Sequence, residues 1–122
     1  MVDDEAGIRM LVVEVLQELG YAVLEAEDGP RALAILQSEN SIDFMITDVG
    51  LPGGINGRQL ADTAQLHRPN LKVLFITGYA DSSVIRKGVL GPGMHIMTKP
   101  FNLKELTSRV RVILSESDER PH

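Results

Sequence analysis

The chain of 122 residues, 43% of them hydrophobic, has the size and composition of one ordinary globular domain and leaves no room for a second. Its formal charge of -5, from 17 acidic and 12 basic residues, argues against a function built on binding nucleic acid or anionic membranes. The lack of cysteine excludes disulfides, zinc-thiolate sites and thiol catalysis, and the sequence carries neither a signal peptide nor an apolar run of roughly 18 residues. We therefore expect a cytoplasmic protein without membrane contact.

The first third of the chain predicts a helix, a strand and a second helix. Apolar residues recur at helical spacing over residues 8–19, and Gly20 follows where a left-handed C-terminal cap would lie. Residues 21–26 (YAVLEA) predict a short strand. Asp28 then precedes a helical pattern over residues 29–39.

The rest of the chain continues the alternation. Two compact runs rich in Ile, Val and Phe, residues 42–48 and 71–77, have the composition of strands covered on both faces. Residues 57–69 between them predict a helix that Pro69 stops. Residues 95–100 predict a fifth strand, and the segment from Asn102 to Ile113 predicts a last helix with a cap at its start.

Strands and helices that alternate in this way predict a doubly wound α/β fold with a five-stranded parallel sheet, because parallel strands need helical crossovers. We assign residues 1–115 to this domain and residues 116–122 (ESDERPH) to a polar C-terminal tail. Residues 80–95 contain three glycines and one proline, so any helix there should be short.

Polar residues gather at one edge of the predicted sheet. Asp48, Thr77 and Lys99 lie at or near the carboxyl ends of three strands, and Asp3 and Asp4 immediately precede the first helix. Ligands of open parallel sheets bind at this edge. We therefore expect these five side chains to converge.

The chemistry of the group points to phosphoryl transfer. Three close carboxylates repel one another unless a hard divalent cation such as Mg²⁺ lies among them. Asp48 can then attack a phosphorus atom while the cation and Lys99 neutralise charge on the phosphoryl oxygens, and the Thr77 hydroxyl can hydrogen-bond one of those oxygens. The glycines that follow Asp48 allow the backbone to approach the site closely.

Four motifs occur in order at these positions: VDDE (2–5), ITDVGLP (46–52), FITG (75–78) and TKPF (98–101). With them the chain resembles the receiver domains of two-component response regulators from Asp3 to about Leu114. It looks most like the receiver modules at the C-terminal ends of hybrid sensor kinases. The resemblance implies a flavodoxin-like fold.

The resemblance also implies the roles of the site residues. Asp48 would be the phosphoacceptor, Thr77 the switch hydroxyl and Lys99 the phosphate-binding lysine. The ligands of Mg²⁺ would be Asp3, Asp4, Asp48 and the backbone carbonyl of Gly50. The donor would be a phosphohistidine on a sensor histidine kinase or a histidine phosphotransfer protein.

The switch region implied by the family comprises Gly78, Tyr79, Ile96 and Pro100. The bond from Lys99 to Pro100 is usually cis in the family, and Ile96 stands where an aromatic residue usually reports phosphorylation. With Ile96 there, a tyrosine flip is impossible, and Tyr79 is the candidate to shield the site.

Two further departures concern the backbone. Only Met1 and Val2 precede Asp3, so the first strand is apparently truncated and could be supplied by another copy. The loop after Asp48 is one residue longer than the commonest spacing, an insertion that Gly53 and Gly54 would absorb.

Three functions follow for this chain. The favoured one is a phosphoacceptor switch, which is not an enzyme but assists its own phosphotransfer and autodephosphorylation, and which acts as a monomer or weak homodimer. A phosphohydrolase with an aspartate nucleophile would need a carboxylate two positions after Asp48 as its acid or base, and Gly50 occupies that position. A pseudo-receiver that only binds a partner would have lost some of the five site residues.

Overall fold

The computed structural model of the chain describes residues 1–38, 42–51, 53–78 and 93–116. The expected helix between residues 80 and 92, Tyr79 and the tail beyond residue 116 lie outside these ranges. None of the helices in the described ranges has the length and apolar character that a bilayer crossing requires.

A parallel sheet forms the centre of the molecule. Its strands β1 (Phe44–Asp48), β2 (Lys72–Thr77) and β3 (Met94–Thr98) lie side by side in that order. Every residue of β2 is buried, as a strand covered on both faces requires. The register pairs Asp48 with Ile76 and Thr77 with Thr98, so the carboxyl ends of the strands share one edge.

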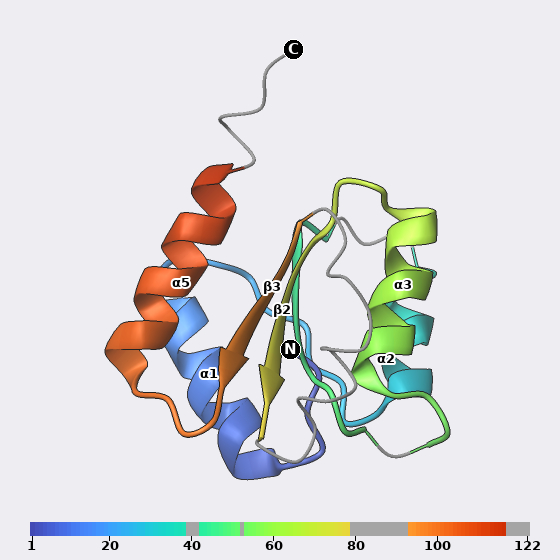
Figure 1. Ribbon diagram of the computed structural model, residues 1–122, viewed down its shortest axis with the longest axis horizontal. Helices are drawn as coiled ribbons and strands as arrows, with labels where there is room; N and C mark the ends of the chain where they lie inside the picture. Colours follow the sequence, from blue (N-terminus) through green and yellow to red (C-terminus); the bar gives the residue numbers. More distant parts are fainter. Residues whose placement is uncertain (39–41, 52, 79–92, 117–122) are drawn as a thin grey trace.

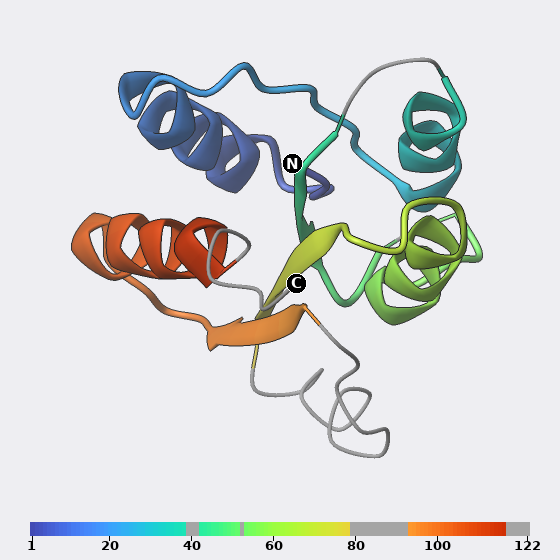
Figure 2. The ribbon, with the colours of Figure 1, turned by 90° about the horizontal axis from the view of Figure 1, so that it is seen from above.

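In the described ranges, helices cover both faces of the sheet (Figures 1 and 2). Helices α1 (Ala6–Glu18) and α5 (Leu103–Glu116) lie on one face, and α2 (Gly29–Leu36) and α3 (Gly57–His67) lie on the other. The fold is therefore the expected doubly wound α/β arrangement.

The helix ends follow the sequence signals. Gly20 has φ of 94° and lies just past the end of α1, where its N–H donates to the carbonyl of Gln17. The Asp28 side chain accepts a hydrogen bond from the N–H of Arg31 and caps α2. Asn56 and Gln59 form a capping box at the start of α3, and the Asn102 side chain accepts from the N–H of Glu105 at α5.

Two apolar clusters fill the space between the helices and the sheet. On the α2–α3 face, Val73 and Phe75 of β2 pack with Leu60 and Ala61. On the α1–α5 face, the alternate residues of β2, Leu74 and Ile76, pack with residues of α1 and α5. This alternation along β2 explains why its sequence is a continuous apolar run.

The sheet differs from the predicted five strands at its other side. Val2 makes single parallel bridges to Thr47 of β1 and to Ala26, so Val2 and Ala26 extend the strand order beyond β1. Residues 21–26 were predicted as a strand, yet within the described ranges Ala26 is the residue of this segment that forms a bridge. Met1 and Asp3 lie beside the segment, with backbone hydrogen bonds to Leu24 and Ala26.

Candidate functional site

The carboxyl edge of the sheet brings together the residues that the sequence singled out. Asp48 ends β1, Thr77 ends β2 and Lys99 follows β3 directly. The N–H of Lys99 donates to the carbonyl of Thr77 at 2.8 Å, and the N–H of Asp48 donates to the carbonyl of Val2 at 3.0 Å. These bonds fix the strand ends and the segment leading to Asp3 relative to one another.

Asp3, Asp4 and Asp48 form an acidic cluster in which one carboxylate oxygen of each lies within 4.8 Å of the others. Asp3 is fully buried, Asp48 is 5% exposed and Asp4 is exposed to solvent. The N–H of Glu5 donates to Oδ1 of Asp3 at 2.9 Å, whereas the buried Oδ2 of Asp3 has no hydrogen-bond partner among the described residues.

Burial of Asp3 has an electrostatic consequence. Loss of solvent, to which the nearby charge of Asp48 adds, raises the pKa of Asp3 from 3.8 to about 6. The Glu5 N–H and the Lys99 ammonium act in the opposite direction by favouring the charged carboxylate. The positive charge near Asp3 therefore does not compensate for the burial of its carboxylate.

These features fit a hard divalent cation. A buried carboxylate oxygen without a partner, beside a second buried and a third exposed carboxylate, offers the all-oxygen and partly open ligand set that Mg²⁺ prefers. The cluster can therefore bind a metal ion, which would give Oδ2 of Asp3 the partner that it lacks.

Lys99 supplies the positive charge on the other side of Asp48. Its Nζ lies 3.1 Å from Oδ2 of Asp48 and 3.6 Å from Oε1 of Glu5. Hydrogen bonding and charge attraction from Asp48 raise the pKa of Lys99 although desolvation opposes them, so the ammonium keeps its proton. Glu5 was missed in the sequence analysis, and its position directly after the aspartate pair was the available signal.

Thr77, Gly50 and Arg9 make further hydrogen bonds at the site. The buried Thr77 hydroxyl donates to the carbonyl of Gly78 at 2.9 Å, so it must turn to reach a group bound at Asp48. The N–H of Gly50 donates to Oδ1 of Asp48 at 3.3 Å, which holds the loop after β1 close to that carboxylate. Arg9, which the sequence analysis also missed, donates to the carbonyl of Asp3 at 2.7 Å.

The loop after Asp48 needs glycine for two reasons, a positive φ at two positions and a close backbone approach at a third. Gly53 and Gly54 have φ of 90° and 87°, values that favour glycine. Gly57 allows a close approach, because a Cβ built at this position would lie 2.1 Å from the carbonyl oxygen of Asp48. The loop thus returns the chain tightly to the end of β1.

Among the residues for which the resemblance implies a switch role, Pro100 follows a cis peptide bond from Lys99, as the resemblance also implied. Ile96 pairs with Phe75 within the sheet and is partly buried against the α2–α3 cluster. Gly78 follows β2 next to Thr77 and accepts its hydroxyl, while Tyr79 lies outside the described residues.

Comparison with known proteins decides the family. The family profile described as "Response regulator receiver domain" matches residues 1–111. The chain belongs to the response regulator receiver domain family. Its members serve two-component signalling as phosphoacceptors, so the resemblance found in the sequence is confirmed.

Receiver domains occur both alone and within longer proteins, and the relatives of this chain include both kinds. It is 33% identical over 119 residues to the sensor kinase CckA of Brucella abortus (strain 2308), covering 97% of this chain and 12% of that protein. It is 31% identical to the sporulation initiation phosphotransferase F of Bacillus subtilis (strain 168), covering 93% of this chain and 90% of that protein. Some of the curated relatives are thus much longer than the chain.

Solved receiver domains share the fold. A response regulator receiver protein from Sinorhizobium medicae WSM419 has a TM-score of 0.83 at 30% identity, covering 93% of this chain and 90% of that one. The receiver domain from the hybrid histidine kinase CckA has a TM-score of 0.77 at 33% identity, covering 93% of this chain and 94% of that one. The flavodoxin-like receiver fold is therefore established for this chain.

Proposed function

We propose that Asp48 accepts a phosphoryl group from a phosphohistidine on a sensor histidine kinase or a histidine phosphotransfer protein. The observation that carries the proposal is the Lys99 ammonium, 3.1 Å from Oδ2 of Asp48 at the edge of an acidic cluster. A carboxylate, a fixed ammonium and a set of oxygen ligands are the parts that phosphoryl transfer needs.

In the proposed reaction, a carboxylate oxygen of Asp48 forms a bond to phosphorus as the bond from phosphorus to the histidine nitrogen breaks, and that nitrogen keeps the electron pair. Mg²⁺, held by Asp3, Asp4, Asp48 and the carbonyl of Gly50, would neutralise negative charge on the phosphoryl oxygens. The product is an acyl phosphate on Asp48.

Lys99 and Thr77 respond to the new group. Lys99 shifts its ammonium from the Asp48 carboxylate to a phosphoryl oxygen. That oxygen carries more negative charge than the acyl group of Asp48, which is neutral once it is bonded to phosphorus. The Thr77 hydroxyl leaves the carbonyl of Gly78 and donates to another phosphoryl oxygen. Attack of water on phosphorus later returns Asp48 to its free carboxylate, which is the autodephosphorylation that ends the signal.

Incubation with acetyl phosphate and Mg²⁺, followed by intact-mass spectrometry, tests the acceptor. We expect one added phosphoryl group in the unmodified chain and none in Asp48→Asn. Asp62→Asn is the matched control, because the Asp62 side chain on α3 is 55% exposed and pairs with Arg58. A phosphoryl group on the Asp48→Asn chain would overturn the assignment.

The same experiment distinguishes the other two functions. A phosphohydrolase would release many equivalents of phosphate per chain without lasting modification, but Gly50 supplies no acid or base for rapid turnover. A pseudo-receiver would stay unmodified and would not bind beryllium fluoride. Stable modification at a one-to-one ratio is the result that the proposed switch requires.

A further inference from the structure

Arg9 of α1 bonds to the backbone of the acidic cluster. Its Nη1 donates to the carbonyl oxygen of Asp3 at 2.7 Å. That oxygen belongs to the peptide group that joins Asp3 to Asp4, and both residues contribute carboxylates to the cluster. Because a peptide group is planar, a bond that fixes its carbonyl also fixes the directions in which the chain leaves toward each aspartate.

The Asp3 carbonyl lies where the backbone pairing of this segment ends. The N–H of Asp3 donates to the carbonyl of Ala26 at 3.1 Å, as in a parallel ladder. The next bond of such a ladder would come from the N–H of Asp28. Asp28 instead caps α2, and in the described part of the chain the donor to the Asp3 carbonyl is the Arg9 side chain. Arg9 thus takes the place of a backbone donor.

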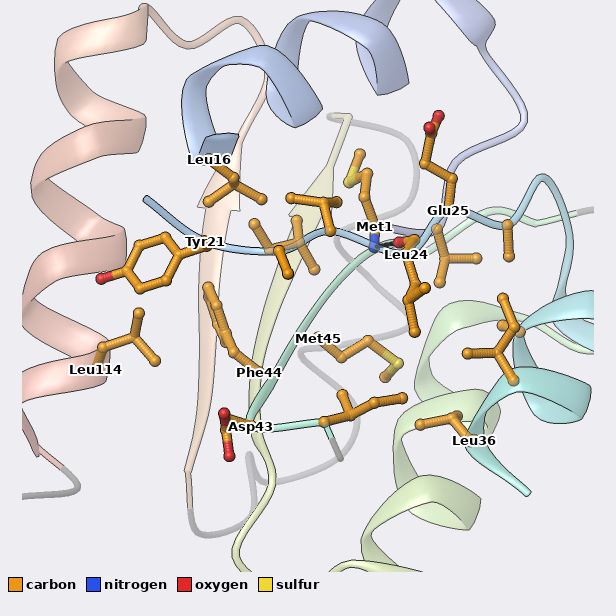
Figure 3. Close-up of a pocket in the computed structure, with 18 residues that line it drawn as sticks. Met1, Leu16, Tyr21, Leu24, Glu25, Leu36, Asp43, Phe44, Met45 and Leu114 are labelled. Atoms are coloured by element: carbon orange, nitrogen blue, oxygen red, sulfur yellow. Dashed lines mark hydrogen bonds between the residues drawn. The ribbon is translucent and has the colours of Figure 1, made fainter. Parts of the chain in front are cut away.

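Glu25 holds the other edge of the guanidinium. Nε of Arg9 lies 3.3 Å from Oε1 of Glu25. Figure 3 shows Glu25 at the rim of an apolar cavity, with its carboxylate directed away from Phe44 and Met45. A guanidinium is rigid and planar, so bonds at Nε and Nη1 together set its orientation.

The ion pair leaves little net charge beside the cluster. An uncompensated arginine would repel a divalent cation at the neighbouring aspartates. The Glu25 carboxylate balances the charge of Arg9, and the Arg9 side chain is only 19% exposed. The main effect of Arg9 is therefore on the geometry of the peptide between Asp3 and Asp4.

We propose that Arg9 is a positioning residue for the Mg²⁺ site, which holds the peptide between Asp3 and Asp4 so that both carboxylates face one cation. The proposal rests on the Mg²⁺ site of the proposed function. Asp4 depends most on this bond, because its side chain is exposed, whereas Asp3 is buried and also bonded by the N–H of Glu5.

Titration of the chain with Mg²⁺ in a calorimeter, at a temperature at which every variant is folded, tests the proposal. We expect Arg9→Met to bind Mg²⁺ at least about 10-fold more weakly, because partners that orient metal ligands contribute on this scale. Arg9→Gln should show the same loss and avoids placing an apolar group at this position. Arg9→Lys should stay within about threefold of the unmodified chain, since its ammonium can still donate to the Asp3 carbonyl.

Arg31→Met is the matched control. Arg31 also pairs through Nε with a glutamate, at 3.1 Å from Oε1 of Glu27, but its side chain on α2 is 67% exposed. We expect its Mg²⁺ isotherm to match that of the unmodified chain. Arg9→Met combined with Glu25→Gln removes both charges of the inner pair and should still bind Mg²⁺ weakly, because the carbonyl bond is lost.

Labelling by acetyl phosphate at increasing Mg²⁺ concentration separates positioning from a structural role. In Arg9→Met, the Mg²⁺ concentration that gives half the maximal rate should rise by the factor found in calorimetry. The maximal rate should change little, because Asp48 and Lys99 keep their places. A loss of stability alone would leave the half-saturating concentration unchanged in folded protein.

Three results would overturn the proposal. One is equal or tighter Mg²⁺ binding in Arg9→Met, and tighter binding would show that the charge of Arg9 dominates. Another is a lower maximal labelling rate with an unchanged half-saturating Mg²⁺ concentration. The third is a loss in Arg9→Lys as large as that in Arg9→Met. Failure of the unmodified chain to accept a phosphoryl group would instead overturn the proposed function, while the calorimetric comparison would still decide the role of Arg9.

Discussion

Lys99 is the residue whose placement most directly links the fold to the proposed chemistry. Its N–H is bonded to Thr77 at the end of β2, and its Nζ reaches Asp48 at the end of β1. Three adjacent strands therefore determine where its charge lies. The pairing with Glu5 is secondary, because Glu5 is more than half exposed and 3.6 Å away.

Replacing Lys99 should separate phosphorylation from metal binding. We expect Lys99→Met to slow labelling by acetyl phosphate by roughly 10- to 100-fold, because a charge-assisted hydrogen bond worth about 1.5–3 kcal/mol is lost. Binding of Mg²⁺ should be kept or tightened, since Asp48 loses a competing cation. Labelling rates and titration calorimetry check the two effects.

Lys104→Met is the control for that substitution, because Lys104 lies on the exposed surface of α5. It should leave both the labelling rate and the calorimetric isotherm unchanged. An unaltered labelling rate in Lys99→Met would remove Lys99 from the proposed mechanism.

At the scale of elements, the junction between β1 and α3 is the tightest part of the site. Helix α3 begins at Gly57, whose N–H donates to the carbonyl of Val49 at 2.7 Å. The position has no room for a side chain, because backbone atoms of Asp48 and Val49 lie against it. The acceptor aspartate and the first turn of α3 are thus held as one unit.

Gly57→Ala should therefore destabilise the domain. The added Cβ meets backbone, which cannot rotate away, so we expect a loss of roughly 1–3 kcal/mol in the free energy of unfolding. Gly7→Ala in α1 is the matched control. A Cβ there meets nothing within 4 Å, and replacing glycine in a helix stabilises by up to about 1 kcal/mol.

Urea unfolding of both variants measures the change in the free energy of unfolding. An unchanged midpoint for Gly57→Ala would contradict this account of the junction.

For the whole molecule, the periodicity of the sequence was enough to predict the layers and the edge that holds the site. Asp48 and Lys99 are 51 positions apart, yet their meeting was predictable because parallel strands place their carboxyl ends together. The Thr77 hydroxyl bond to Gly78 was not predictable, because it depends on a side-chain rotation. Residues 21–26 were predicted as a strand, although the described part of the chain shows a single bridge there, because strand propensity says nothing about whether a neighbouring strand is present.

Two buried groups at the start of the chain make the stability of the whole domain depend on pH. Asp3, which faces Asp48, Glu5 and Lys99, has a native pKa raised to about 6, so between pH 3.8 and about 6 the native chain keeps a proton that the unfolded chain has lost. The free energy of unfolding therefore falls as pH rises through that window. Burial lowers the pKa of the Met1 amino group, which faces Glu25, from 8.0 to about 6. Between these values the unfolded chain holds the extra proton, and stability rises with pH.

The two windows meet, so we expect the free energy of unfolding of the 122-residue chain, measured by urea titration without metal, to pass through a local minimum near pH 6. Asp3→Asn should remove the fall below pH 6 and leave the rise above it. Acetylation of the Met1 amino group should do the opposite, because the acetylated group cannot take up a proton. Saturating Mg²⁺ should flatten the lower limb, since a bound cation favours the charged form of Asp3 at every pH in that window. A curve that rises steadily from pH 4 to 8 would show that the burial of Asp3 does not control its protonation.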